Sequence, residues 1–188
     1  VAVGPERLVR SEAGLALVRF LVSRQRNNEA GRLLEGYLAH DERDHQSRFA
    51  LAELHALEGR PAQAEEQYRR IIALDETGPS GLTARTRLAA LAGRQGRPEE
   101  AAALLEEVLA ANSRDVEALT LRAGLALGRR DPAAAIADLR TALRDEPRSA
   151  RLLQLLARAH LAAGETELAR DALQRAVDAN PGDADVRT

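Results

Sequence analysis

The chain of 188 residues lacks cysteine, lysine, methionine and tryptophan altogether. Without cysteine it can form no disulfide, thiol nucleophile or zinc thiolate. Without lysine it has neither a Schiff-base lysine nor the lysine of a phosphate-binding loop, and all 27 basic residues are arginine. These absences exclude several classes of enzyme. They do not choose between cytoplasm and periplasm, because a protein without cysteine suits both.

Aromatic residues and long apolar runs are also scarce. Two Tyr and two Phe offer few surfaces for stacking bases, and the formal net charge of −2 arises from charges of both signs spread along the chain. We therefore expect no binding to nucleic acid, with an RNA-reading helical repeat as the alternative. Apolar runs such as Ala13 to Val18 are far shorter than the roughly 18 residues of a membrane span, so we expect no direct membrane insertion.

The first residue is valine, and the chain is rich in Ala, Leu, Gly and Arg. These two features lead us to expect a piece of a longer bacterial protein from a GC-rich genome. This inference concerns codon supply and not function.

The polar residues show no arrangement typical of a catalytic or metal site. The four histidines lack the spacing that places two imidazoles on one helical face; they are His40, His45, His55 and His160. Adjacent glutamates such as Glu65-Glu66 point about 100° apart on a helix and cannot share an acid–base site. The segment around Ser80 resembles a nucleophile elbow, but that motif needs glycine two residues after the serine, where this chain has Leu82. The segment is therefore interpreted as a loop between repeats. We expect no catalytic residue, cofactor or metal.

What the chain does contain is a repeat of 34 residues, in blocks 11–44, 45–78, 82–115, 116–149 and 150–183, with residues 79–81 outside the period. Small residues occupy the eighth and twentieth positions of the blocks: Val18, Ala52, Ala89, Ala123 and Ala157, then Ala30, Ala64, Ala101, Ala135 and Ala169. Large residues occupy the seventh and twenty-fourth: Leu17, Leu51, Leu88 and Leu156, with Arg122 as the exception, then Leu34, Tyr68, Leu105, Leu139 and Leu173. Small residues facing large ones predict two antiparallel helices that cross closely in each block.

Glycine, proline and capping residues agree with this division. Gly59 and Gly96 are expected to end helices in the left-handed conformation, and Pro61 and Pro98 to begin the next ones. Asp131-Pro132 predicts the same kind of helix start with a capping carboxylate. Helix N-caps are expected at the block boundaries, at Asp44, Asp115, Ser149 and Asp183. Each block therefore predicts helix, turn, helix.

The pattern resembles the tetratricopeptide repeat family over residues 11–183. The last block carries the family's residues at the family's spacing: Leu153, Leu156, Ala157, Gly164, Ala169, Ala176 and Pro181. The resemblance implies an all-α fold, a right-handed α-solenoid of helix-turn-helix hairpins, and a protein–protein interaction scaffold as its function. Residues 1–10 are interpreted as an incoming segment or the end of an upstream repeat, and 184–188 as the start of a truncated following helix.

In this family the first helix of each repeat lines a concave groove that holds another protein or peptide. The resemblance places these candidate residues in the groove: Leu15, Arg19, Val22, Phe49, Glu53, Leu57, Thr86, Ala90, Arg94, Thr120, Gly124, Leu127, Arg151, Gln154, Arg158 and Leu161. They are apolar at the start and small in the middle, and arginines gather toward the end. We expect an amphipathic helix or extended segment as partner, apolar at one end and acidic at the other. The alternative is a merely solvated inner face.

Three further expectations concern partners. Family members that hold chaperone tails use lysines and asparagines in the groove, whereas this chain has Leu15, Arg19, Phe49 and Glu53 there, so chaperone tails are not expected. Leu173 and Val177 are expected at an uncapped repeat end, where two molecules could associate. The alternative function is a docking or assembly module of a larger bacterial envelope or exopolysaccharide secretion machine, or of surface-protein sorting.

Overall fold

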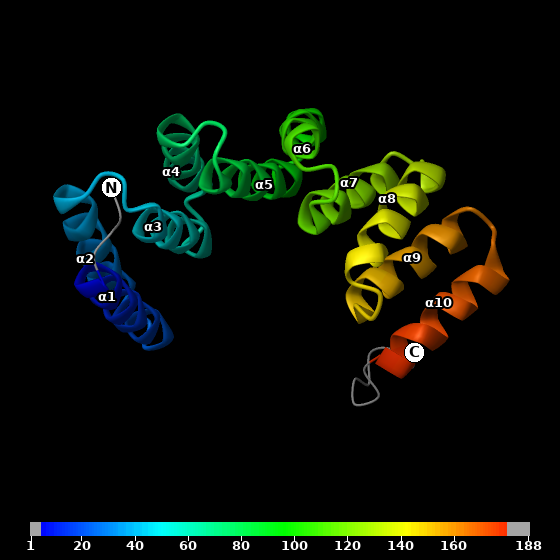
Figure 1. Ribbon diagram of the computed structural model, residues 1–188, viewed down its shortest axis with the longest axis horizontal. Coiled ribbons are helices and arrows are strands. Elements are labelled where there is room, and N and C mark those ends of the chain that lie inside the picture. The colour runs from blue at the N-terminus through cyan, green and yellow to red at the C-terminus, as the bar shows by residue number, and fades with distance from the viewer. Residues whose placement is uncertain (1–4, 180–188) are drawn as a thin grey trace. The chain divides into compact units, whose positions relative to one another are not determined.

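Ten helices and no strand are found in the part of the chain that the structure describes (Figure 1). The structure is a computed structural model and describes the backbone of residues 5–179 and the side chains of residues 12–179. The helices form five consecutive hairpins, each with a first and a second helix. The first helices are α1 (Pro5–Ser23), α3 (His45–Leu57), α5 (Pro79–Arg94), α7 (Val116–Gly128) and α9 (Ala150–Ala162). The second helices are α2 (Asn27–His40), α4 (Pro61–Leu74), α6 (Pro98–Ala111), α8 (Pro132–Asp145) and α10 (Thr166–Ala179). The predicted all-α fold is confirmed.

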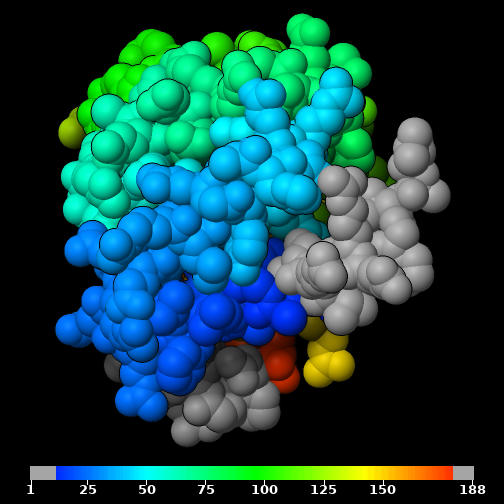
Figure 2. All heavy atoms as spheres, turned by 90° about the vertical axis from the view of Figure 1, so that its left-hand side faces the viewer, coloured from blue at the N-terminus to red at the C-terminus, as the bar shows by residue number. Residues whose placement is uncertain are grey.

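The chain divides into two compact units, Val1–Leu88 and Ala89–Thr188, with the boundary inside α5. In unit 1, α1 packs against α2 and α3, and α3 packs against α2 and α4. Figure 2 shows the hairpin of α1 and α2 in blue, with the side chains of the two helices in contact. The core between the first three helices consists of Val18, Leu21, Ala30, Leu34, Leu51 and Leu54.

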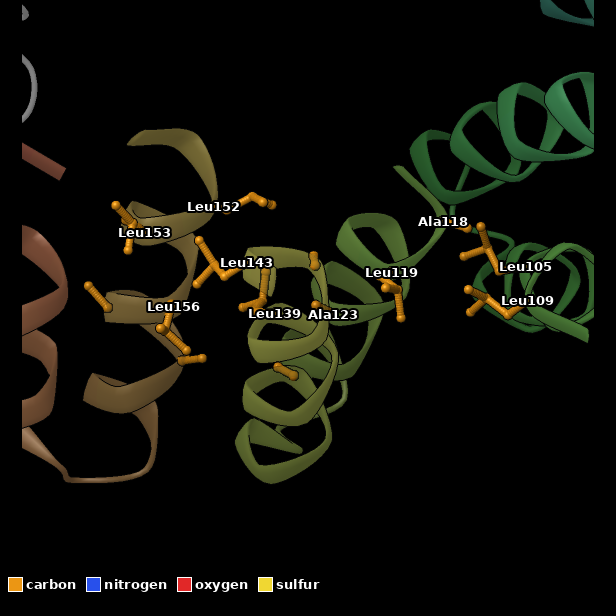
Figure 3. Close-up of a cluster of buried hydrophobic side chains, with 14 of the residues drawn as sticks. Leu105, Leu109, Ala118, Leu119, Ala123, Leu139, Leu143, Leu152, Leu153 and Leu156 are labelled. Carbon is orange, nitrogen blue, oxygen red and sulfur yellow. The ribbon is translucent and has the colours of Figure 1, made fainter. Parts of the chain in front are cut away.

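The core of unit 2 continues from one helix to the next. It joins the end of α5 to α6, α7, α8, α9 and α10, and includes Ala92, Leu105, Leu119, Leu139, Leu153 and Ala172. Figure 3 shows this core from α6 to α9, with the labelled leucine and alanine side chains lying between neighbouring helices. Removing such leucines from water stabilises the unit by about 1.5 to 3 kcal/mol for each side chain.

The small residues at the helix crossings are buried as predicted. All ten residues at the eighth and twentieth positions are buried, and the most exposed of them, Val18, is only 4% exposed. The large residues at the seventh and twenty-fourth positions are buried as well, except at the two ends of the array. There Leu17 is 47% and Leu173 is 38% exposed, because among the described residues α1 and α10 have a neighbouring hairpin on one side.

The turn inside each hairpin has the same backbone conformation. Its fifteenth block position has a positive φ in every hairpin: Gln25 59°, Gly59 69°, Gly96 72°, Arg130 59° and Gly164 79°. The left-handed conformations predicted for Gly59 and Gly96 are thus confirmed. Pro61, Pro98 and Pro132 stand in the first turns of α4, α6 and α8, where the missing proline N–H costs no helical hydrogen bond.

Carboxylate caps begin three of the helices. The side chains of Asp44, Asp115 and Asp131 accept hydrogen bonds from the backbone N–H of the residues three positions on, at 3.1, 2.8 and 3.0 Å. Ser149 stands at the N-cap of α9 but its side chain makes no capping hydrogen bond. Asp183 and the segments 1–4 and 184–188 lie outside the described residues.

Two helices begin earlier than the blocks predict. α1 begins at Pro5, so residues 5–10 belong to the first helix, and proline favours such a start. α5 begins at Pro79, so residues 79–81 are its first turn and Ser80 is helical, which corrects the loop expected there. Asp75 caps this turn, because its Oδ2 accepts the N–H of Ser80 at 2.9 Å and that of Gly81 at 3.3 Å. A Cβ on Gly81 would stand 1.8 Å from the carbonyl oxygen of Asp75, so only glycine fits.

Arg122 is the one polar residue at the seventh block position, and its charge is matched across the hairpin. Its Nε donates to Oδ2 of Asp138 at 2.8 Å, and its Nη2 donates to Oδ1 at 2.7 Å. Asp138 is only 9% exposed. The hydrogen bond from Arg122 to Asp138 raises the pKa of Arg122 further above its ordinary value, so the guanidinium stays charged. This bidentate pair joins α7 to α8 where the other hairpins have leucine.

Candidate functional site

The candidate residues of unit 1 give an apolar surface on α1 and α3, two helices that contact each other. Leu15 and Val22 are half-buried and pack against the core with part of their side chains. Leu57 is 67% exposed, more than any other large apolar residue that the structure describes. Arg19 and Glu53 are exposed on the same two helices. This part of the predicted site thus has apolar side chains available to a partner.

Phe49 has part of its contact surface inside unit 1. Its ring centroid lies 6.2 Å from that of Tyr68, with the two rings tilted by 51°. Aromatic pairs at such a separation stabilise one another, so Phe49 joins α3 to α4 as well as presenting a half-buried edge.

Two candidate threonines are buried. Thr86 is 3% and Thr120 is 6% exposed. The hydroxyl of Thr86 donates to the carbonyl of Leu82 at 3.2 Å, and that of Thr120 donates to the carbonyl of Val116 at 2.6 Å. Because these hydroxyls are satisfied within their own helices, both threonines offer little surface or hydrogen-bonding capacity to a ligand.

The candidate residues of unit 2 lie on α5, α7 and α9. We call this surface the unit 2 inner face and define it by Ala90, Arg94, Thr120, Gly124, Leu127, Arg151, Gln154, Arg158 and Leu161. α7 and α9 contact each other, so their residues can share one surface. Gly124 is exposed, and a Cβ added there would meet no atom within 4 Å. Beside it on α7, Leu127 is half-buried, so the middle of this face has open space next to an apolar side chain.

The inner face of unit 2 carries arginines without partners. Arg94, Arg151 and Arg158 are exposed, and no described residue forms an ion pair or hydrogen bond with their guanidinium groups. Most arginines elsewhere in the described residues have a partner, as Arg114 has in Asp145. Leu161 follows Arg158 on α9 and is 55% exposed. Unpaired guanidinium groups beside an exposed leucine can hold a carboxylate and an apolar side chain together.

The described residues contain no cluster of three or more His, Cys, Asp or Glu side chains that could hold a metal ion. The helices that the structure describes include none that is long and apolar enough to cross a membrane.

Sequence reasoning missed a hollow of about 410 Å³ between the second helices α8 and α10. One signal for it was visible in the sequence. Leu168 stands at the nineteenth position of its block, where the other blocks have Glu29, Gln63, Glu100 and Ala134. A large apolar residue at a position that is otherwise polar or small indicates an apolar surface there.

Family models identify the chain. A model described as tetratricopeptide repeat matches residues 15–79 and 86–136, and a second model with the same description matches residues 126–188. The chain belongs to the tetratricopeptide repeat family. This family's fold is an α-solenoid, and it supports a protein–protein interaction scaffold. Tetratricopeptide scaffolds are generally not enzymes.

Solved structures agree on the fold. A thermophilic tetratricopeptide protein of Thermus thermophilus has a TM-score of 0.73 and 22% identity over 94% of this chain and 95% of its own. PilW, a widely conserved type IV pilus biogenesis factor, has a TM-score of 0.78 and 19% identity over 94% of this chain and 80% of its own. YrrB, a tetratricopeptide protein with an unusual peptide-binding site, has a TM-score of 0.63 and 14% identity over 92% of this chain and 87% of its own. No curated protein matches the chain in sequence. At sequence identities of 22% or less, these similarities show the fold alone.

Proposed function

We propose that this tetratricopeptide protein holds a segment of another protein, an amphipathic helix or an extended stretch, on its first helices. The acidic residues of that segment bind the unit 2 inner face. In unit 1, the exposed apolar residues of α1 and α3 form a separate surface that contacts apolar side chains of a partner. The single observation that carries the proposal is the set of exposed guanidinium groups without partners at Arg94, Arg151 and Arg158.

The chemistry of the inner face favours carboxylates. An arginine can bind a carboxylate through two parallel hydrogen bonds, and such charge-assisted bonds are about twice as strong as neutral ones. Arg151 and Arg158 lie two helical turns apart on α9, so one helix or strand of a partner can reach both. Leu161 and Leu127 would contact apolar side chains between the carboxylates.

A structural neighbour supports a peptide as ligand. YrrB is described as having an unusual peptide-binding site, and it shares this fold. By analogy of fold, we extend peptide binding to this chain.

Charge reversal tests the proposal. The probe is a fluorescein-labelled amphipathic peptide with leucines in its first half and glutamates in its second, and the measurement is fluorescence anisotropy on the whole chain. Replacing Arg151 and Arg158 together with glutamate should weaken binding by at least about tenfold, because attraction becomes repulsion at both positions on α9. Circular dichroism should show an unchanged helical signal.

The matched control reverses two other exposed arginines of unit 2 that are unpaired among the described residues, Arg130 and Arg148. Its charge change is the same, but neither residue belongs to the inner face. Equal binding by the Arg151 and Arg158 variant and the wild type, or equal losses in both double variants, would refute the proposal.

A bulky side chain at Gly124 gives an independent test of the same face. The Cβ that Gly124→Leu adds meets no atom of the protein within 4 Å, so the variant should keep its fold and block the probe. Gly36→Leu on α2 is the control, since an added Cβ there also meets nothing within 4 Å.

The alternative role, as an assembly module of an envelope or exopolysaccharide secretion machine, stays a prediction. A pilus biogenesis factor shares the fold, and that likeness favours this role over unrelated ones. A reading frame of the whole gene with a signal peptide or lipobox would support it, and a frame ending in a cytoplasmic enzyme domain would count against it.

A further inference from the structure

The hollow between α8 and α10 lies entirely within unit 2 and outside the inner face. Its residues come from three helices: Arg140, Leu143 and Arg144 of α8, Leu156 and His160 of α9, and Leu168, Asp171, Ala172 and Arg175 of α10. A volume of about 410 Å³ lies within the range of small-ligand and side-chain pockets. We call it the α8–α10 hollow.

The floor of the α8–α10 hollow is apolar and fixed. Leu143, Leu156 and Ala172 are at most 8% exposed and belong to the core of unit 2. His160, 3% exposed, is held in place by a hydrogen bond between its Nδ1 and Oε2 of Glu165, at 2.5 Å. A floor that is already packed needs no rearrangement when a ligand binds.

The rim of the hollow is positively charged. Three arginines stand around one carboxylate, and only Arg175 is near it, with Nη1 3.7 Å from Oδ2 of Asp171. Arg140 and Arg144 are exposed, and the described residues offer their side chains no ion pair or hydrogen bond. Two cationic groups are therefore available to a ligand.

An exposed leucine completes the rim. Leu168 is 46% exposed, and Glu29, Gln63, Glu100 and Ala134 take its place in the other hairpins. The first three hairpins have glutamate or glutamine at this position, and their small residues at the eighth and twentieth block positions are still buried. Burial of the core therefore does not depend on Leu168. An apolar side chain at a polar position, next to two unpaired arginines, points to a ligand that is both acidic and apolar.

We propose that the α8–α10 hollow is a second docking site, which takes an acidic peptide segment with one aliphatic side chain. The carboxylates of the segment bind Arg140 and Arg144, and its aliphatic side chain covers Leu168 and the apolar floor. An inorganic anion would gain nothing from Leu143, Leu156 and Leu168. A nucleic acid would find no Phe, Tyr or Trp ring for its bases among the lining residues, and the imidazole of His160 is only 3% exposed. The charge and the apolar floor together thus favour a peptide.

The test uses a short fluorescein-labelled peptide, Asp-Glu-Leu-Asp-Glu, with both ends blocked, and fluorescence anisotropy on the whole chain. Replacing Arg140 and Arg144 with glutamate should weaken binding by at least about tenfold, since two charge-assisted contacts become repulsive. Leu168→Ser should weaken it as well, while leaving the core untouched. Reversal of Arg151 and Arg158 should weaken binding of this peptide less than reversal of Arg140 and Arg144, which separates this site from the inner face.

Two further peptides and one salt serve as controls. A peptide with glycine in place of leucine should bind more weakly, and one with lysines in place of the acids should not bind. Sodium phosphate should compete only through ionic strength. The proposal is overturned if the wild-type chain does not bind the leucine peptide, if the glycine peptide binds equally well, or if phosphate displaces it at low concentration.

Should the double variant unfold by circular dichroism, Leu168→Ser and Arg144→Gln replace it, because both residues are exposed. Unchanged affinity in these two variants would also overturn the proposal. The proposal would also be overturned if binding were lost only on reversal of Arg151 and Arg158, because the peptide would then bind the inner face.

Discussion

At the scale of single residues, several polar groups in the described interior are compensated by a nearby partner. Arg122 has Asp138, and the buried threonines have their own helix carbonyls. Within the part of the chain that the structure describes, Asn27, His45, Arg48 and Glu58 each keep one buried side-chain atom without a hydrogen-bond partner, and so does His55. It is 8% exposed, lines a hollow of about 370 Å³ beside α2, and its Nδ1 is buried without a hydrogen-bond partner in the described residues. A neutral imidazole tolerates this position better than a charged one.

This environment makes stability depend on pH. Burial lowers the pKa of His55 below its ordinary value of 6.5, and nearby Arg60 lowers it further, although Glu35 and Glu66 oppose the shift. A histidine whose pKa is lowered on folding binds its proton more readily when unfolded, so the free energy of unfolding falls as the pH drops below 6.5. We predict that this loss, measured by urea unfolding between about pH 7.5 and 5.5, is smaller in His55→Leu.

The control for this prediction is His40→Leu, since His40 is exposed at the end of α2. An equal pH dependence of the wild type and His55→Leu would show that other groups cause it.

At the scale of helices, the close crossings depend on alanine. Ala135 of α8 is fully buried in the core of unit 2 where α8 crosses α7, and leucine there has no free space. We predict that Ala135→Leu lowers the free energy of unfolding by about 1 to 3 kcal/mol, through overpacking. Chemical denaturation measures the change. Ala134→Leu, at the exposed neighbouring position, is the control and should change stability little. A stable Ala135→Leu would mean that the repeat register is out of phase.

The starts of the helices could be predicted from the sequence only in part. The period placed the starts of α3, α7 and α9 correctly, because a capping residue stands before each and the small and large positions recur. It missed the early starts of α1 and α5, because a block of fixed length cannot show that a helix extends beyond it. For α5 the decisive contact is the approach of Asp75 to Gly81, which is specific to this connection and has no counterpart in the period.

The exposure of the candidate residues could be predicted from the sequence only in part. The family's positions selected exposed side chains such as Arg151, Arg158 and Leu57. They also selected Thr86 and Thr120, because a threonine suits a buried helix face and an exposed one equally well. The α8–α10 hollow could not be read from the period, since it depends on the volume left between three helices.

At the scale of the whole molecule, the last described helix has an incomplete environment. Leu173 of α10 is 38% exposed, although the equivalent residues Leu34, Leu105 and Leu139 are completely buried by the hairpin that follows each of them. An exposed apolar stripe at the end of a repeat array favours self-association. We predict that this chain associates with a second copy through α10 in a concentration-dependent manner, measured by sedimentation equilibrium. Leu173→Glu should shift it toward monomer.

The comparison variant is Leu57→Glu, which removes an exposed leucine of unit 1. A wild-type chain that stays monomeric at every concentration would refute the prediction, and so would equal effects of the two variants.

The ion pair of Arg122 and Asp138 limits how this array can evolve. Repeat proteins gain and lose hairpins by duplication and recombination, and a chain of interchangeable hairpins tolerates a crossover at many points. A crossover between α7 and α8 would separate the arginine from its aspartate and leave one buried charge alone, at a cost of about 3 to 5 kcal/mol. We therefore expect the fourth hairpin to be inherited as one block, whereas hairpins with leucine at that position are expected to tolerate an exchange of their halves.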